Sequence, residues 1–241
     1  MTIHKISSIS LPQVVFDAIR KVTASGFFQE GIIGGSWCFP FYDAVIGIKY
    51  ELRTLDVDFM ISEALQKRDD LISDLGRELE DEGFISTIDY NTSLQKFFKD
   101  GMEIEFLTPR RGNRDDTLLI RPFNVTAQPL PFLNILFNEP ISIMVEDLHG
   151  IVRIPSPRSL LLHKMIIAHR RQKESKKEKD LDQCKVLSLY CKYEEVQELS
   201  NHFNFGRSTW RDISASCQFI GIPELKHPVQ RMKKLPQGAK V

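Results

Sequence analysis

The sequence predicts a mixed α/β domain followed by a helical domain, and three observations support this. Residues 55–59 and 102–106 alternate apolar and acidic side chains, which predicts half-buried β-strands. Amphipathic helical segments flank these strands, beginning with residues 11–25. After Pro155-Ser156-Pro157 the apolar pattern is helical. We therefore expect a mixed β-sheet with flanking helices over residues 1–155, and a helical domain that closes a cleft over residues 156–241.

The composition bounds the class of protein. The chain has 241 residues and 42% hydrophobic content, enough for a proper core. Its 32 basic and 32 acidic residues balance, so net charge does not indicate nucleic acid, although local clusters stay open. No apolar signal core or run of about 18 apolar residues is present. The four cysteines show no zinc or disulfide spacing and suggest a reducing compartment. These features predict a cytoplasmic protein without a membrane partner.

The first elements lead into a glycine turn. Residues 11–25 predict a helix that ends at Gly26, with one apolar face formed by Val14, Val15, Ala18, Ile19 and Val22. Ile32 and Ile33 then predict the end of a buried strand. Gly34 and Gly35 allow a tight turn with bare backbone N–H groups, and Ser36 can cap the next helix. Such a turn at a helix N-terminus can hold phosphate oxygens.

Two aspartates follow on the next predicted strand. Asp56 and Asp58 alternate with Leu55, Val57 and Phe59, so both carboxylates emerge on one face, about 7 Å apart at Cα. Two like charges in this position favour a bound cation, and Mg²⁺ (or Mn²⁺) accepts carboxylate oxygens while leaving positions for water and phosphates. The pattern indicates phosphoryl or nucleotidyl transfer.

The order of strand, Gly-Gly-Ser turn, short helix and Leu55-Asp56-Val57-Asp58-Phe59 resembles the signature of the DNA polymerase β-like nucleotidyltransferase superfamily. The resemblance implies a nucleotidyltransferase fold, with Asp56 and Asp58 as metal ligands. It also implies that the turn of Gly34, Gly35 and Ser36 cradles the β- and γ-phosphates. Some relatives carry the pattern Arg-x-Thr-x-Asp-x-Asp, and the residues here are Arg53, Thr54, Asp56 and Asp58, with one residue between Thr54 and Asp56. Arg53 is therefore either a nucleotide contact or a surface cation.

The resemblance also implies a third carboxylate on a neighbouring strand. Residues 69–82 predict a helix, with a stripe formed by Leu71, Ile72, Leu75 and Leu79. Residues 84–90 and 94–98 read as strands, and Asp100-Gly101 as a hairpin turn before residues 102–107. Glu103 and Glu105 share one face of that last strand. Glu105 is the expected third ligand, although the family more often has aspartate there, and Glu103 is the reserve candidate.

The C-terminal half reads as a β-hairpin, over residues 141–145 and 151–154, and then helices. Pro157 opens a helix to about residue 171, and its apolar face includes Lys164. Lys164 is either a snorkelling lysine or a contact to the triphosphate. Two further helices are expected over residues 194–203 and 208–219.

Basic residues exceed acidic ones between Lys164 and Lys185. The order His163-Lys164, Arg170-Arg171 and Lys179-Asp180-Leu181 resembles the helical half of bacterial minimal and abortive-infection-type nucleotidyltransferases. There, a Lys-Asp pair at the beginning of a helix lies near the nucleotide. The resemblance implies that Lys179 binds the nucleotide, and that Asp180 orients it or caps the helix.

Together these features predict a metal-dependent nucleotidyltransferase, with an NTP such as ATP as substrate and pyrophosphate as product. The acceptor is open among a protein side chain, an RNA end and a small molecule. One alternative is a non-catalytic nucleotide- or protein-binding module, as half of a toxin–antitoxin or phage-defence pair. Another is an RNA-binding protein that uses Arg110, Arg111 and the lysines of residues 176–179.

Overall fold

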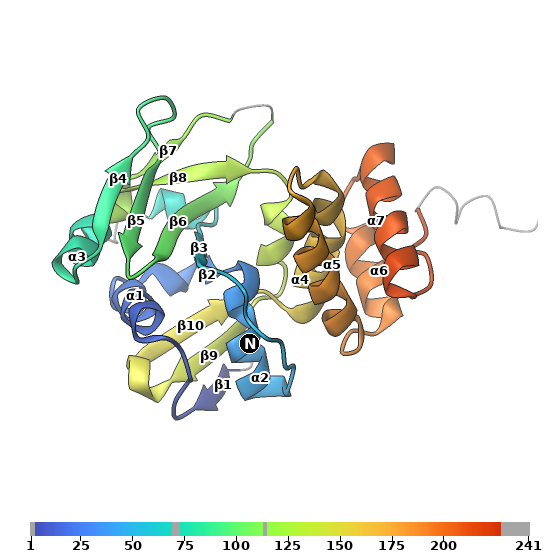
Figure 1. Cartoon of the computed structure of the whole chain (residues 1–241), viewed down its shortest axis with the longest axis horizontal. Helices are drawn as coiled ribbons and strands as arrows, with labels where there is room; N and C mark the ends of the chain where they lie inside the picture. Colours follow the sequence, from blue (N-terminus) through green and yellow to red (C-terminus); the bar gives the residue numbers. More distant parts are fainter. Residues whose placement is uncertain (1–2, 69–72, 113–114, 228–241) are drawn as a thin grey trace, which may run out of the picture. The chain divides into compact units, whose positions relative to one another are not determined.

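The structure is a computed structural model that describes residues 3–68, 73–112 and 115–227. The chain divides into two compact units, Met1–Ser156 and Pro157–Val241 (Figure 1). The first unit combines β-sheets with helices, and the described part of the second unit is helical. The expected mixed α/β class with a helical C-terminal part is therefore confirmed. No helix in the described ranges is long and apolar enough to cross a membrane.

The larger sheet of the first unit carries the acidic strands. In the described residues it has seven strands: five follow the path β2-β3-β6-β5-β4, and off this path β8 pairs with both β6 and β7. The bounds are β2 Ile32–Ile33, β3 Asp56–Met60, β4 Ile85–Ile88, β5 Gln95–Lys99, β6 Met102–Pro109, β7 Leu118–Ile120 and β8 Val125–Leu130. β3 runs parallel to β6, whereas β2 and β5 run antiparallel to their neighbours. Asp100 and Gly101 both have positive φ between β5 and β6, which confirms the predicted hairpin turn.

A smaller sheet has the order β1-β9-β10. β9 (Ile141–Val145) and β10 (Gly150–Ile154) form the predicted antiparallel hairpin around a 3₁₀ turn, η6 (Glu146–Leu148). β1 (Ile3–Ile6) adds a parallel edge strand that the sequence analysis did not predict.

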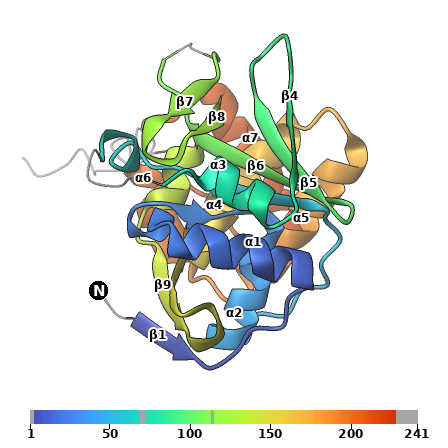
Figure 2. The same cartoon turned by 90° about the vertical axis from the view of Figure 1, so that its left-hand side faces the viewer.

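The described residues of the first unit also form three α-helices: α1 Gln13–Ala24, α2 Cys38–Ile46 and α3 Leu75–Asp81. The buried face of α1 consists of the five predicted apolar residues. α1 lies beside α3, as Figure 2 shows. α3 begins after Asp74, whose carboxylate accepts the Arg77 N–H at 3.2 Å. Leu75 and Leu79 of the predicted stripe are buried, whereas Leu71 and Ile72 lie outside the described residues.

The core behind the acidic strands is aromatic. Phe27, in the short helix η1 (Phe27–Gln29), contacts the rings of Phe59 and Phe106 with centroids 5.8 and 6.1 Å away. Phe59 of β3 and Phe106 of β6 stack at 5.7 Å, and Phe97 of β5 meets Phe106 edge to face. All four rings are fully buried. Because side chains alternate along a strand, this packing turns the intervening residues toward the opposite face.

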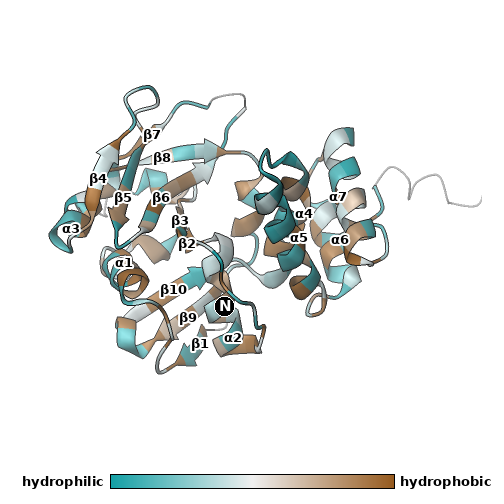
Figure 3. Ribbon diagram, viewed as in Figure 1, coloured by the Kyte–Doolittle hydropathy of each residue, from teal (hydrophilic) through white to brown (hydrophobic). Residues whose placement is uncertain are grey.

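The second unit is built around α4 (Pro157–Ile167), which contacts α5 (Glu174–Ser188), α6 (Tyr193–Asn201) and α7 (Arg207–Ile220). The sequence predicted one apolar face for α4, but every residue from Ser159 to Ile166 is buried. α5 is largely hydrophilic, as its teal colour in Figure 3 shows. α6 and α7 lie within a few residues of the predicted helices, and Cys184 of α5 is buried in the core.

The aromatic core predicts a stability effect. Phe106→Ala removes a fully buried ring that contacts three others, so the free energy of unfolding should fall by about 3–5 kcal/mol. Urea titration measures this change in the free energy of unfolding. Ile88→Ala in the same sheet, at a side chain 58% exposed, should change stability by less than about 0.5 kcal/mol. Equal losses in the two variants would contradict the central position of this cluster.

Candidate active site

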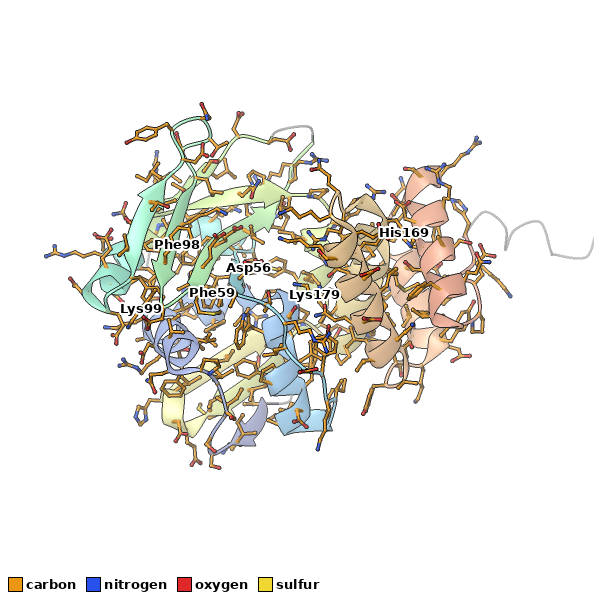
Figure 4. The ribbon with its side chains drawn as sticks, viewed as in Figure 1. Asp56, Phe59, Phe98, Lys99, His169 and Lys179 are labelled. Carbon is orange, nitrogen blue, oxygen red and sulfur yellow. The ribbon has the colours of Figure 1, made fainter. Side chains whose placement is uncertain are left out.

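Four carboxylates share one face of β3 and β6. The parallel register places Asp58 opposite Glu105 and Asp56 opposite Glu103. All four are partly exposed, while Val57 and Ile104 between them are buried on the other face. The two predicted acidic strands are therefore adjacent and in matched register. Figure 4 labels Asp56 on this face and the core residue Phe59.

The glycine turn after β2 lies against Asp58. The Gly34 N–H donates to the Asp58 carbonyl at 2.8 Å. Gly35 has a φ of +63°, and a Cβ at that position would lie 2.5 Å from Asp58 Oδ2. Both the left-handed backbone and the close carboxylate therefore require glycine here. At Gly34, the Met60 side chain fills the space that a Cβ would need.

Trp37 fixes the same turn to the acidic strand from the other side. Its indole N–H donates to the Asp56 carbonyl at 3.0 Å, and the residue is 3% exposed. The sequence analysis gave Trp37 no role. An indole needs a hydrogen-bond acceptor when it is buried, so a tryptophan directly after the glycine turn was the available signal.

Ser36 does not cap a helix, and that prediction was wrong. The turn continues as a 3₁₀ helix, η2 (Gly35–Trp37), which leads directly into α2, so Ser36 lies inside helical backbone. Neither N-cap, Gly34 nor Trp37, makes a side-chain capping bond. Ser36 is nevertheless buried in the turn beside Gly35. A phosphate contact by Gly34, Gly35 and Ser36 stays a prediction.

Lys96 of β5 is a site residue that the sequence analysis missed. β5 pairs Lys96 with Glu105, so Asp58, Glu105 and Lys96 form one row across three neighbouring strands. The Lys96 ammonium donates to Glu103 Oε1 at 2.6 Å and also to Glu105 Oε1. The signal was present: a two-residue turn at Asp100-Gly101 pairs Lys99 with Met102, and counting back pairs Lys96 with Glu105.

The surroundings of Glu105 perturb its proton affinity. Burial, a hydrogen bond with Glu103 and the nearby Asp58 charge raise the pKa of Glu105 to about 7, against the opposing effect of Lys96. For Lys96, burial favours the neutral form, but the hydrogen bonds to Glu103 and Glu105 outweigh it and raise the pKa of the ammonium. Lys96 is therefore a cation at neutral pH.

The expected convergence of Asp56, Asp58 and Glu105 around one cation is not found. In the ranges that the structure describes, no group of three His, Cys, Asp or Glu side chains is arranged to hold a metal ion. The physical reason is that Glu105 pairs with Lys96 instead. The donor chemistry still fits a divalent cation such as Mg²⁺, because all four groups are carboxylates on one face and Asp58 borders the space above Gly35.

Arg53 lies before β3 and is exposed. Its guanidinium pairs with Glu51 at 2.8 Å, and both side chains are more than 70% exposed. This placement agrees with a surface cation. Its contact to a nucleotide stays a prediction.

In the helical unit, Lys164 belongs to a buried ion cluster. Its ammonium lies 2.6 Å from Asp180 Oδ1, and Arg171 Nε lies 2.8 Å from Asp180 Oδ2. Burial alone would raise the pKa of Asp180, but Lys164 and Arg171 hold it below its usual range. Lys164 is therefore neither a snorkelling lysine nor exposed, since only 4% of its side chain is accessible.

The Lys179-Asp180 pair does not begin a helix, which corrects the expectation. α5 begins at Glu174, so the pair lies inside it, and Asp180 pairs with Lys164 and Arg171 rather than capping the helix or orienting Lys179. Lys179, labelled in Figure 4, is half-buried. Its contact to a nucleotide stays a prediction.

The arginines proposed for RNA contact are paired with acids where they are described. Arg110 pairs with Asp115 at 2.7 Å and Arg111 with Glu63 at 2.8 Å, whereas Asn113 and Arg114 lie outside the described residues. Lys177 likewise pairs with Glu174. These pairs reduce the positive charge on which an RNA-binding surface would depend.

Comparison with known proteins supplies a family. A family model described as Nucleotidyltransferase matches residues 13–205. No curated protein matches the chain. Among solved structures, an antigenic nucleotidyltransferase-like protein from Paracoccidioides brasiliensis aligns at 15% identity with a TM-score of 0.41, over 86% of this chain and 94% of that one. A tRNA nucleotidyltransferase, in complex with a primer tRNA and an incoming ATP analog, aligns at 11% identity with a TM-score of 0.23, over 85% of this chain and 62% of that one.

The contact between Gly35 and Asp58 predicts an effect on cation binding. Gly35→Ala should displace the Asp58 carboxylate and weaken Mn²⁺ binding by roughly tenfold or more, besides costing about 1 kcal/mol for the left-handed backbone. Calorimetric titration measures the affinity. Gly47→Ala is the matched control, since Gly47 also has positive φ but no atom within 4 Å of the added Cβ. If both variants bind Mn²⁺ equally, Gly35 only shapes the turn.

His163 predicts how stability depends on pH. It is fully buried beside the Lys164–Asp180 pair, and neither ring nitrogen has a hydrogen-bond partner in the described structure. Burial and then Lys164 lower the pKa of His163 to about 3, so between pH 3 and 6.5 the unfolded state binds the extra proton. The contribution of His163 to the free energy of unfolding should therefore fall on the order of 2 kcal/mol from pH 7 to pH 5, whereas Glu105, with its pKa raised to about 7, contributes in the opposite direction.

Urea titrations at the two pH values check this contribution. Between pH 7 and pH 5, the free energy of unfolding of His163→Leu should change more favourably than that of the wild type, by on the order of 2 kcal/mol, because the contributions of Glu105 and His169 are common to both. His202→Gln, at an exposed position, should show the same pH dependence as the wild type. If the free energy of unfolding of His163→Leu changed between the two pH values as it does in the wild type, a group other than His163 would be responsible.

Proposed function

This chain belongs to the nucleotidyltransferase family, and from that premise we propose that it is a metal-dependent enzyme that transfers a nucleoside monophosphate from a nucleoside triphosphate, such as ATP, to an acceptor. The single observation that carries the proposal is the row formed by Asp58 and Glu105 beside the glycine turn. Two adjacent acidic strands and a bare backbone turn combine the groups that bind a cation and a phosphate.

Each part of the row has a proposed task. Asp56 and Asp58 hold the divalent ion, Mg²⁺ or Mn²⁺, and Glu105 is the third acidic group with Glu103 in reserve. When bound, the ion neutralises phosphate charge and stabilises the charge that develops on the leaving group. The turn of Gly34, Gly35 and Ser36, which leads through η2 into α2, is proposed to cradle the β- and γ-phosphates.

The proposed reaction is an in-line displacement at the α-phosphorus. The acceptor forms a new bond to phosphorus while the bond to the bridging oxygen breaks, and pyrophosphate leaves with that electron pair. The acceptor proton passes to Glu105, whose pKa of about 7 suits a general base near neutral pH. Arg53 and Lys179 are proposed as further phosphate contacts. Lys164 is not, because its ammonium is buried against Asp180.

A second candidate is a nucleotide- or protein-binding module without catalysis, as one half of a toxin–antitoxin or phage-defence pair. The specific observation in its favour is the pairing of Glu105 with Lys96, which occupies the proposed third ligand. The two functions differ in catalysis: the enzyme transfers a nucleotide, and the binding module does not. The acceptor classes of the enzyme proposal are a protein side chain, an RNA end and a small molecule.

Labelled nucleotides test the enzyme proposal. Incubating the protein with α-labelled NTPs, Mg²⁺ or Mn²⁺ and whole lysate should move the label to one of the three acceptor classes. A γ-labelled NTP should give labelled pyrophosphate only. Asp58→Asn should lower transfer by roughly 100-fold or more, because it removes a proposed ligand charge. It should also reduce the thermal stabilisation by Mg-ATP, which is about 2.7 kcal/mol at a hundredfold excess over Kd.

Asp147→Asn is the matched control, since Asp147 is an exposed aspartate in η6. It should transfer label as the wild type does. Stabilisation by Mg-ATP without any transfer of label would favour the binding module. If no NTP caused either stabilisation or transfer, both the enzyme and the nucleotide-binding module would be contradicted.

A further inference from the structure

The register of the sheet determines the position of Lys96. Its strand is antiparallel to β6, so the backbone pairing of Lys96 with Glu105 fixes where the side chain emerges. On the opposite face of β5, Lys99 donates to the Glu82 carbonyl at 2.7 Å. The strand is therefore anchored on both faces, and Figure 4 labels Phe98 and Lys99 on it.

The ammonium of Lys96 contacts two of the four carboxylates. It donates to Glu103 and Glu105 together, and only 30% of its side chain is exposed. Glu103 and Glu105 are thereby already bound to a cation. The acidic face is split into a half occupied by lysine and a half formed by the aspartates.

A divalent ion at Glu105 would have to share the space of the ammonium. Sites with two metal ions place them roughly 3.5–4 Å apart and bridge them with carboxylates. A lysine and a divalent ion at such a separation repel strongly, because partial burial weakens the screening by water. The geometry therefore opposes a divalent ion at the glutamates.

We propose that Lys96 is a built-in cation that takes the place of a second metal ion and limits this site to one divalent ion. The inference rests on the proposed function, because Asp56 and Asp58 must bind that ion. Lys96 acts as a positioning residue, since it holds Glu105 on the β5 side of the face. Without the charge of Lys96, Glu103 and Glu105 can bind a second divalent ion.

The test is Mn²⁺ stoichiometry, measured by electron paramagnetic resonance of free Mn²⁺ without nucleotide. The wild type should bind one ion. Lys96→Met keeps the length of the side chain but removes its charge, and it should bind two, with the second ion gaining at least roughly tenfold in affinity. Lys96→Gln is a second uncharged variant and should also bind two ions. It keeps the test decisive if Lys96→Met does not fold.

Two controls isolate the charge at this position. Lys96→Arg keeps a cation and should bind one ion. Lys99→Met removes a lysine from the opposite face of the same strand and should also bind one. One ion in the folded Lys96→Met and Lys96→Gln variants overturns the proposal, as do two ions in the wild type, and both results leave the proposed function standing. No ion in any variant overturns the metal dependence as well.

Discussion

The parallel pairing of β3 with β6 is the constraint on which the site depends. Its register is held at both ends of the ladder, because the Glu103 N–H donates to the Leu55 carbonyl and the Ile61 N–H to the Leu107 carbonyl, both at 2.8 Å. A slip of one residue would turn every side chain of a strand to the other face. The stacked rings of Phe59 and Phe106 oppose such a slip, since it would expose one of them. Core packing thus determines where the carboxylates lie.

This arrangement concentrates negative charge, and the fold offsets part of it with its own lysine. Carboxylates of neighbouring strands repel one another unless a cation lies between them. Lys96 meets that need on the β6 side, while Asp58 lies against the glycine turn on the β3 side. The helical unit repeats the principle in its interior, where Asp180 is enclosed by Lys164 and Arg171. In each unit, a lysine thus pairs with a buried or half-buried acid.

The sequence predicted the elements well where a simple period applied. The alternation around Asp56 and Glu105, the five-residue stripe of α1 and the hairpin of β9 and β10 each depend on local spacing. The strand β1 was missed because its partner is β9, more than a hundred residues away, and four residues of edge strand carry little pattern.

The site was only partly predictable for the same reason. Which residues share the acidic face follows from periodicity, but the choice of partner for Glu105 depends on the neighbour supplied by β5. Lys164 looked anomalous on an apolar stripe, and its partner Asp180 is sixteen residues away on another helix. Ser36 had the right residue type for a cap, yet the 3₁₀ turn at Gly35 shifted the helix start past it.

The bond from the Trp37 indole to the Asp56 carbonyl also gives the molecule a spectroscopic handle. The chain has two tryptophans, and each unit holds one: Trp37 in the first and Trp210 in α7 of the second. Both are largely shielded from water. The fluorescence of Trp37 therefore reports on the backbone of the acidic strand, while that of Trp210 reports on the helices alone. Two variants, each keeping only one of the two tryptophans, can therefore follow the melting of each unit separately within the intact chain.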